Sequence, residues 1–282
     1  MAYRILAFDS GIGGLGVVQS LRQQLSRNGI EAIIDYLADN AVFPYGEQPD
    51  DRLIQRIVTI IGQAIHKLKP DLIVIACNTA STIALDTLRK TYPFIPFVGC
   101  VPPIRWAARL SKTRYIGLLA TRATVRRPYL QDLQKQYAAD CKLIAYGSPN
   151  LARIAEQFYR GETTDLKAIA IELAALFHIP ESEHIDTICL GCTHYTFIMD
   201  ALKNLSSSNI QWLDPAPAVA KHAIDLLQKG VIPQRAIEGH ANHNRFFFTA
   251  PPIEDNNLLK QINKLDYDRI LNFETDSSKI LA

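Results

Sequence analysis

Short apolar runs alternate with amphipathic stretches along most of the chain. RILAF precedes GGLGVVQSLRQQL, LIVIAC precedes STIALDTLRK, and TICLGC precedes FIMDALKNL. Apolar runs of this length are typical of buried strands, and the amphipathic stretches that follow have the length and periodicity of helices. The repeated order of strand and helix predicts an α/β fold with mainly parallel sheets.

An internal sequence repeat indicates how these elements are grouped. DLIVIACNT reaches Cys77 six residues after its aspartate, and DTICLGCTH reaches Cys192 after the same interval. At a similar distance before each segment stands a strand that ends in small or polar residues, at Asp9 in one case and at Thr121 in the other. We therefore predict two similar Rossmann-like α/β lobes, with the active site in the cleft between them.

The lobe boundaries are predicted from breaks in this pattern. Pro102 and Pro103 interrupt it in GCVPPIRWAA, and the polar segment NLSSSN interrupts it again near residue 207. The first lobe is expected to comprise residues 1–98 and a C-terminal segment, about 211–282, that returns to it. Residues 99–210 are expected to form the second lobe.

Composition excludes several classes of protein. The five cysteines are an odd number scattered over 282 residues, so they predict free thiols in a reducing compartment and no disulfide framework. A net charge of +2 without a strong basic cluster argues against nucleic acid as the main partner. No apolar run approaches the ~18 residues of a membrane span, and MAYRILAFDSG has too short an apolar stretch for a signal peptide. We expect a cytoplasmic protein without membrane association.

The segment FDSGIGGLGVV contains a literal GxGxxG between a strand and a helix, and Asp39 follows at the end of the next apolar run. This is the dinucleotide-binding pattern, although the glycines also suit a plain strand-to-helix turn. Asp9 stands directly before the loop, where its carboxylate would face a pyrophosphate. The loop and Ser10 could instead bind a smaller anion such as an amino-acid carboxylate. Asp39 is then expected to order the loop structurally.

Cys77 and Cys192 each lie where a strand passes into a predicted helix. A helix N-terminus lowers the pKa of a thiol from ~8.5 towards neutrality, so either sulfur could be a thiolate. One thiol from each lobe could remove a proton from one face of a Cα–H bond and return a proton to the other face. The alternative for each is a buried small apolar residue.

A CxxC pair of Cys189 and Cys192 is a weaker hypothesis. Cys189 falls inside an apolar run, and the sequence contains no second pair to complete a zinc site. We therefore predict no metal. Cys100 and Cys141 are interpreted as packing residues.

Five segments together resemble the glutamate racemases of the aspartate/glutamate racemase superfamily: FDSGIGGLGV, YLADNAVFPYGEQP, IACNTAS, FVGCVPPIRWA and LGCTHY. The resemblance implies catalytic thiols at Cys77 and Cys192, assisted by Asp9, His194 and Glu156. It implies a substrate-binding set of Asp9, Ser10, Tyr45, Gly46, Asn78, Thr79, Thr121 and Thr193. It also implies an isomerase that works without pyridoxal phosphate or metal. The resemblance further implies a homodimer that supplies D-glutamate for peptidoglycan.

Three alternatives stay open from the residues alone. An aspartate racemase would use the same mechanism. A nicotinamide-dependent oxidoreductase would use the GxGxxG loop, and a non-catalytic amino-acid-binding protein would have no use for two matched thiols.

Overall fold

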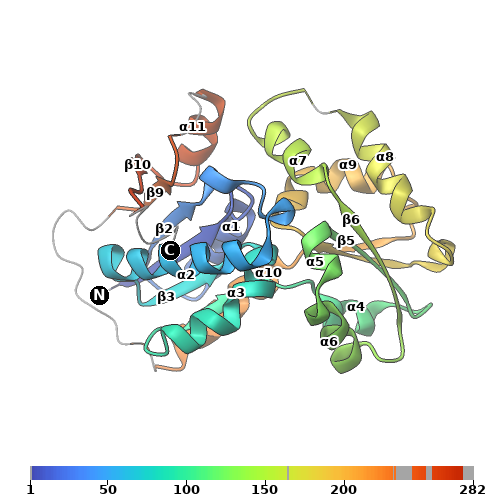
Figure 1. Ribbon diagram of the computed structural model, residues 1–282, viewed down its shortest axis with the longest axis horizontal. Helices are drawn as coiled ribbons and strands as arrows, with labels where there is room; N and C mark the ends of the chain where they lie inside the picture. Colours follow the sequence, from blue (N-terminus) through green and yellow to red (C-terminus); the bar gives the residue numbers. More distant parts are fainter. Residues whose placement is uncertain (1, 164, 231, 233–242, 252–255, 276–282) are drawn as a thin grey trace. The chain divides into compact units, whose positions relative to one another are not determined.

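The computed structural model of the protein describes residues 2–163, 165–230, 232, 243–251 and 256–275 (Figure 1). The chain divides into two compact units, Met1–Cys100 with Ala216–Ala282 and Val101–Pro215. The sequence placed the return to the first lobe near residue 211. Gln211–Leu213 instead forms β8, which pairs with a strand of the second unit, so the change of unit falls after Pro215.

The first unit is built on a six-stranded sheet of order β10-β9-β2-β1-β3-β4. Its strands are β1 (Tyr3–Asp9), β2 (Ala32–Ala38), β3 (Leu72–Ile75), β4 (Phe97–Gly99), β9 (Arg245–Phe248) and β10 (Arg269–Asn272). Every pairing in it is parallel. The C-terminal strands β9 and β10 therefore extend the sheet that the N-terminal strands begin.

Helices cover both faces of this sheet (Figure 1). On one face α2 (Asp50–Leu68) packs against α3 (Asn78–Thr91), and on the other α1 (Leu15–Arg27) packs against α10 (Ala216–Gln228). Side chains alternate along a strand, so Leu6 and Phe8 of β1 join the core beneath α2 and α3 while Ile5 faces the other side. Full burial of each such side chain contributes about 1.5–3 kcal/mol. The unit also contains η1 (Asn40–Val42), η2 (Tyr45–Glu47) and α11 (Asn256–Asn263).

The second unit has a four-stranded parallel sheet of order β6-β5-β7-β8. Its strands other than β8 are β5 (Tyr115–Thr121), β6 (Lys142–Ser148) and β7 (Thr187–Gly191). Helices α4 (Ile104–Leu110) and α6 (Pro128–Tyr137) share one core with this sheet. Figure 1 shows α7 (Leu151–Tyr159), α8 (Leu166–Phe177) and α9 (Met199–Asn204) on its other side. The remaining elements are α5 (Arg122–Arg126), η3 (Ser182–His184) and η4 (Thr193–Ile198).

The two sheets have the same strand order over four strands. The order β2-β1-β3-β4 in the first unit corresponds to β6-β5-β7-β8 in the second, and each is parallel throughout. The predicted α/β fold with two similar lobes is confirmed. Among the described residues, no helix combines the length and the apolarity that crossing a bilayer would require.

Candidate active site

Asp9, Ser10 and Cys77 lie together at one edge of the first sheet. We call this cluster, with its neighbours, the first half-site. Phe8 of β1 lies opposite Ile75 of β3, so the residues that follow both strands meet at the carboxyl edge. Cys77 Sγ lies 3.9 Å from Ser10 Oγ, which lies 3.3 Å from Asp9 Oδ1. All three side chains are buried. A thiol, a hydroxyl and a carboxylate thus form one chain through which a proton could pass.

Cys77 is also the N-cap of α3, as the sequence predicted. Its Sγ accepts a hydrogen bond from the backbone N–H of Ala80 at 3.4 Å. A sulfur in this position lies at the positive end of the helix dipole. The position therefore favours the thiolate, which is the reactive form of cysteine.

Asn78 presents an amide donor beside Cys77. The Cys100 thiol donates to Asn78 Oδ1 at 3.6 Å, while Asn78 Nδ2 is buried and has no hydrogen-bond partner among the described residues. An unsatisfied buried donor costs about 1–3 kcal/mol, which an acceptor such as a ligand carboxylate would recover. Cys100 was interpreted as packing alone; it also orients this amide. Thr79, buried on the first turn of α3, completes this part of the half-site.

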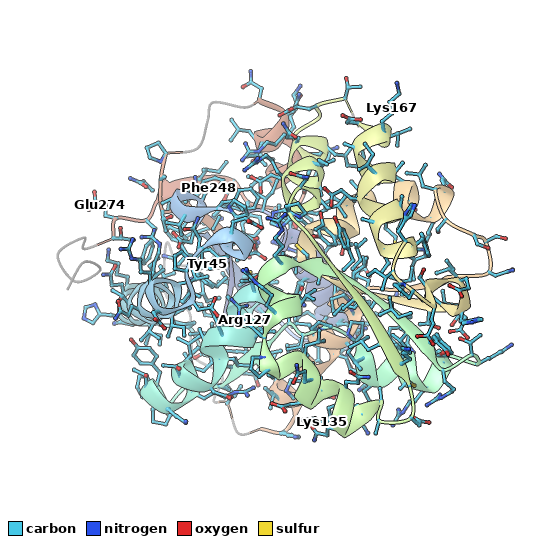
Figure 2. All side chains as sticks on the ribbon, turned by 45° about the vertical axis from the view of Figure 1, so that its right-hand side comes forward. Tyr45, Arg127, Lys135, Lys167, Phe248 and Glu274 are labelled. Carbon is cyan, nitrogen blue, oxygen red and sulfur yellow. The ribbon has the colours of Figure 1, made fainter. Side chains whose placement is uncertain are left out.

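Tyr45 and Gly46 belong to a turn, η2, that Asp39 holds in place. The Tyr45 hydroxyl donates to Asp39 Oδ2 at 2.6 Å, and Arg56 of α2 binds both carboxylate oxygens at 2.6 Å. Burial, and then the neighbouring Asp39 charge, raise the pKa of Tyr45 well above its ordinary value. The phenol therefore stays protonated and donates to Asp39; Figure 2 labels Tyr45. The loop-ordering role that the sequence assigned to Asp39 agrees with these contacts.

These contacts weigh against the dinucleotide interpretation of the glycine loop. In that interpretation Asp39 would receive a ribose hydroxyl, but its fully buried carboxylate already accepts from Arg56, Tyr45 and Thr249. Gly14, which the motif does not specify, is a closely packed glycine of this loop. A Cβ there would stand 2.8 Å from both Ala76 Cβ and the Tyr36 hydroxyl, so close packing requires glycine.

The second half-site brings together Cys192, His194 and Glu156. Cys192 Sγ lies 3.9 Å from His194 Nδ1, and His194 Nε2 lies 2.9 Å from Glu156 Oε2. The other oxygen, Glu156 Oε1, accepts from Arg160 at 2.9 Å. Sequence motifs pointed to the first three residues but not to Arg160, whose only signal is its spacing of four from Glu156 on a helix.

His194 and Glu156 change each other's pKa values. Burial alone would lower the pKa of His194, but the hydrogen bonds and charges of Cys192 and Glu156 outweigh it and raise the pKa to about 10. Burial would raise the pKa of Glu156, but His194 and Arg160 outweigh it and lower that pKa. The arrangement therefore favours an imidazolium between a carboxylate and the sulfur, which can donate a proton to a thiolate.

The segment after Cys192 differs from the predicted helix. Thr193–Ile198 forms the 3-10 helix η4, and the Cys192 side chain makes no capping bond. Its β-branched and aromatic residues, THYTFI, are poor α-helix formers. Thr193 is buried at the start of η4, and Thr121, at the end of β5, accepts from the backbone N–H of Thr124 at 3.3 Å. Both threonines thus lie at the carboxyl edge of the second sheet.

The remaining three cysteines, Cys100, Cys141 and Cys189, are buried. Cys189 lies inside β7 in the core, where burial raises its pKa strongly, and all five cysteines are free thiols. No cluster of metal-ligating side chains occurs in the ranges that the structure describes. Cys141 is buried in the core of the second unit, as predicted for a packing residue.

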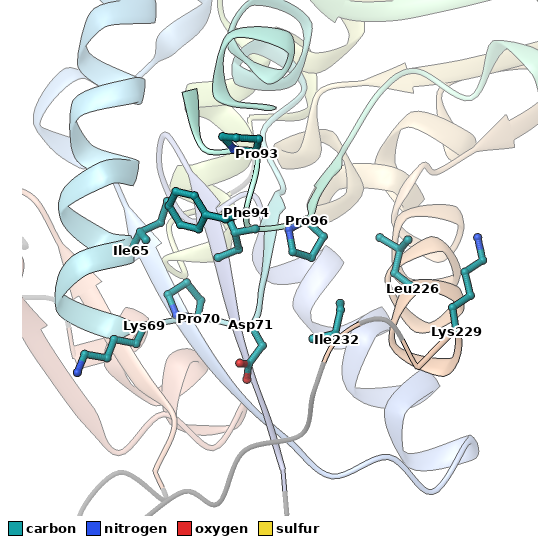
Figure 3. A pocket seen from close by; sticks show the side chains of 11 residues that line it. Ile65, Lys69, Pro70, Asp71, Pro93, Phe94, Pro96, Leu226, Lys229 and Ile232 are labelled. Atoms are coloured by element: carbon teal, nitrogen blue, oxygen red, sulfur yellow. The ribbon is translucent and has the colours of Figure 1, made fainter. Parts of the chain in front are cut away.

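A cavity of about 540 Å³ lies in the first unit, but at the other end of β3 from Cys77 (Figure 3). Phe94 and Pro96 line it, and Lys69 and Lys229 stand at its sides. None of the predicted catalytic or substrate-binding residues is among the described residues lining it. Volume alone therefore does not mark the site at which the acid–base groups gather.

A known family matches the part of the chain that contains both half-sites, except Asp9 and Ser10. The sequence profile of the Asp/Glu/hydantoin racemase family matches residues 13–223. The chain belongs to the Asp/Glu/hydantoin racemase family. The predicted resemblance, and with it the prediction of an isomerase, is confirmed.

Individual members of the Asp/Glu/hydantoin racemase family agree with this assignment. The glutamate racemase of Granulibacter bethesdensis is 50% identical over 219 residues, 78% of this chain and 76% of that protein. The glutamate racemase of Brucella anthropi is 41% identical over 85% of this chain and 84% of that protein. The crystal structure of Escherichia coli glutamate racemase in complex with L-glutamate and the activator UDP-MurNAc-Ala is 31% identical, with a TM-score of 0.87 over 97% of this chain and 98% of that one.

Proposed function

We propose that the protein interconverts L- and D-glutamate by two-base proton transfer, with Cys77 and Cys192 as the bases. The observation that carries the proposal is that each sheet presents a buried thiol after its equivalent strand, each joined to its own acid–base groups. Relatives named glutamate racemase, 50% and 41% identical to this chain, support glutamate as the substrate.

In the proposed reaction one thiolate removes the α-hydrogen as a proton and becomes a thiol. The electron pair of the broken C–H bond stays on the substrate, and the other thiol delivers its proton to the opposite face of the same carbon. That second sulfur ends as a thiolate, so one proton is taken and one is given. The reverse reaction exchanges the roles of Cys77 and Cys192, which explains the use of the same group twice.

The neighbouring groups are proposed to set the protonation state of each thiol. Ser10 and Asp9 provide a path for a proton to and from Cys77. His194, paired with Glu156, does the same for Cys192. The chain's own side chains therefore suffice for the proton transfers.

The substrate is proposed to be held by hydrogen bonds to its two carboxylates. The Asn78 amide has a donor to offer, and Thr79, Thr121 and Thr193 lie at the same sheet edges as the thiols. Hydrogen-bond donors in a buried site stabilise the negative charge of a developing carbanion more strongly than the same donors would in water, because solvent is excluded. We further propose that the protein acts in the cytoplasm as a homodimer and supplies D-glutamate for peptidoglycan.

The test is to incubate the purified protein with L-glutamate in D2O without added cofactor. We expect D-glutamate and deuterium at the α-carbon of the product. Cys77→Ala and Cys192→Ala should each abolish racemisation, whereas Cys141→Ala, in the core of the second unit, should retain it. Neither D-glutamate nor α-deuterium from the wild-type protein would reject the proposal, and faster turnover of L-aspartate in a parallel assay would reassign the substrate.

A further inference from the structure

We propose that Arg160 is a positioning residue of the second half-site. Through its ion pair with Glu156 it keeps His194 oriented towards Cys192. The inference rests on the proposed function, because His194 and Glu156 are the groups proposed to return a proton to Cys192. Its test is designed so that the two can fail separately.

The geometry gives Glu156 two points of attachment. Glu156 and Arg160 stand four residues apart on and just beyond α7, so their side chains lie on the same helix face. Arg160 Nη2 lies 2.9 Å from Oε1, and His194 Nε2 lies 2.9 Å from Oε2. Each oxygen thus has its own partner. Holding both oxygens restricts rotation of the carboxylate, and a fixed carboxylate fixes which imidazole nitrogen faces it.

The charge of Glu156 also depends on both partners. Its side chain is 9% exposed, and that of Arg160 is 15% exposed, so solvent does little to stabilise the carboxylate. A carboxylate so deeply buried stays ionised only beside opposite charge or hydrogen-bond donors. Removing Arg160 would leave His194 as the single described cation in contact with Glu156. The carboxyl group should then take up a proton at higher pH.

Other ionisable groups around Glu156 do not replace Arg160. The 3-10 helix η4, which packs against α7, carries Tyr195, whose hydroxyl donates to the Ala120 carbonyl. From α8, Glu172 approaches the start of α7, and its carboxylate is held by side chains of β6 and of the residue before α7. On α7 itself, Arg153 is exposed. Arg153 therefore offers a matched control on the same helix.

The first experiment compares Arg160→Gln, Arg160→Lys and Arg153→Gln with the wild type by measuring kcat/KM for glutamate between pH 5 and 9. Losing a cationic partner raises the pKa of a carboxyl group, so activity that needs the carboxylate is lost earlier as the pH falls. In Arg160→Gln we expect the acidic limb of the profile to move up by roughly one pH unit. Because the carboxylate also loses its fixed orientation, kcat/KM on the plateau near pH 7 should fall about tenfold. Arg160→Lys should restore most of the loss, and Arg153→Gln should match the wild type.

The second experiment does not need activity. In protein labelled with 15N-histidine, the imidazole signals of His194 are assigned by comparison with His194→Gln. Arg160→Gln should change the His194 nitrogen shifts at neutral pH, and Glu156→Gln should change them in the same direction. An active wild type whose Arg160→Gln variant leaves both the acidic limb and these signals unmoved would overturn the proposal. A wild type without racemase activity would overturn the proposed function, and the histidine signals would then decide the role of Arg160.

Discussion

At the scale of single residues, Cys77 and Cys192 occupy equivalent positions but have different acid–base neighbours. Cys77 caps an α-helix and adjoins a hydroxyl and a carboxylate. Cys192 precedes a 3-10 helix, without a capping bond from its side chain, and adjoins an imidazole paired with a carboxylate. A helix dipole stabilises a thiolate without supplying a proton, whereas an imidazolium does both. The surroundings of the two sulfurs thus differ in physical kind, and the proposed mechanism would use both.

Asn78 provides a prediction at this scale. Asn78→Asp keeps the size of the side chain but replaces the buried N–H donor with an oxygen, which would repel a substrate carboxylate. A hydrogen bond to a charged group is worth about 1.5–3 kcal/mol, so we expect KM for glutamate to rise at least about tenfold. Steady-state kinetics measure this change. Asn204→Asp, exposed at the end of α9, is the control, and an unchanged KM in Asn78→Asp would remove Asn78 from the proposed binding set.

The sequence predicted some of these residues well and others not at all. Cys77 and Cys192 follow apolar runs at matching positions, so the repeat itself pointed to them. Cys100 gave no signal, because its partner Asn78 is 22 residues away and the contact depends on how β4 and α3 pack. The Cys192–His194–Glu156 chain required the fold to bring α7 beside η4. Residue types were predictable, but their hydrogen-bond partners were not.

At the scale of elements, Asp39 links four parts of the first unit. It follows β2, and its backbone N–H donates to the Asp9 carbonyl at 2.8 Å. Its carboxylate receives Tyr45 from η2, Arg56 from α2 and Thr249 from the end of β9, each at 2.6 Å. Each donor that is removed from a buried carboxylate costs free energy, because solvent does not replace it. The returning C-terminal strand therefore helps to hold the turn that carries Tyr45.

Replacing Thr249 tests this link. Thr249→Val removes the hydroxyl that donates to Asp39 and changes the shape of the side chain little. We expect the free energy of unfolding to fall by about 1 kcal/mol and kcat/KM to fall a few-fold, because the turn loses one of its supports. Urea unfolding and steady-state kinetics measure the two effects. Thr59→Val, which removes an exposed hydroxyl from α2, should change neither, and equal effects of the two variants would deny Thr249 a special role.

Elements were predictable where the apolar pattern was long. The strands before Cys77 and Cys192 and the helix after Cys77 lie where the sequence placed them, whereas a 3-10 helix follows Cys192. Two short or weakly patterned elements were missed: β8 has three residues, and β10 is largely exposed. Because their side chains bury little apolar surface, pairing with a neighbouring strand rather than local pattern determines them.

At the scale of the whole molecule, the first unit is discontinuous in sequence. The chain leaves it after Cys100 and returns at Ala216, while Val101–Pro215 forms the second unit from one continuous segment. Each unit has its own hydrophobic core, so the two need not unfold in one step. Both tryptophans of the protein, Trp106 and Trp212, belong to the second unit. Tryptophan fluorescence therefore reports on the second unit, and circular dichroism reports on both.

His194 should make the stability of the second unit depend on pH. Its pKa is raised to about 10 in the folded protein, against about 6.5 for an unperturbed histidine. The folded state therefore binds more protons between these values, so the stabilisation is complete below about pH 6.5 and is lost as the pH rises towards 10. We expect urea unfolding followed by tryptophan fluorescence to show a loss of at least about 1 kcal/mol between pH 7 and pH 9. His194→Gln should remove most of this dependence, whereas His66→Gln, on the exposed side of α2 in the first unit, should preserve it. The same slope in His194→Gln as in the wild type would show that His194 is not charged in the folded protein.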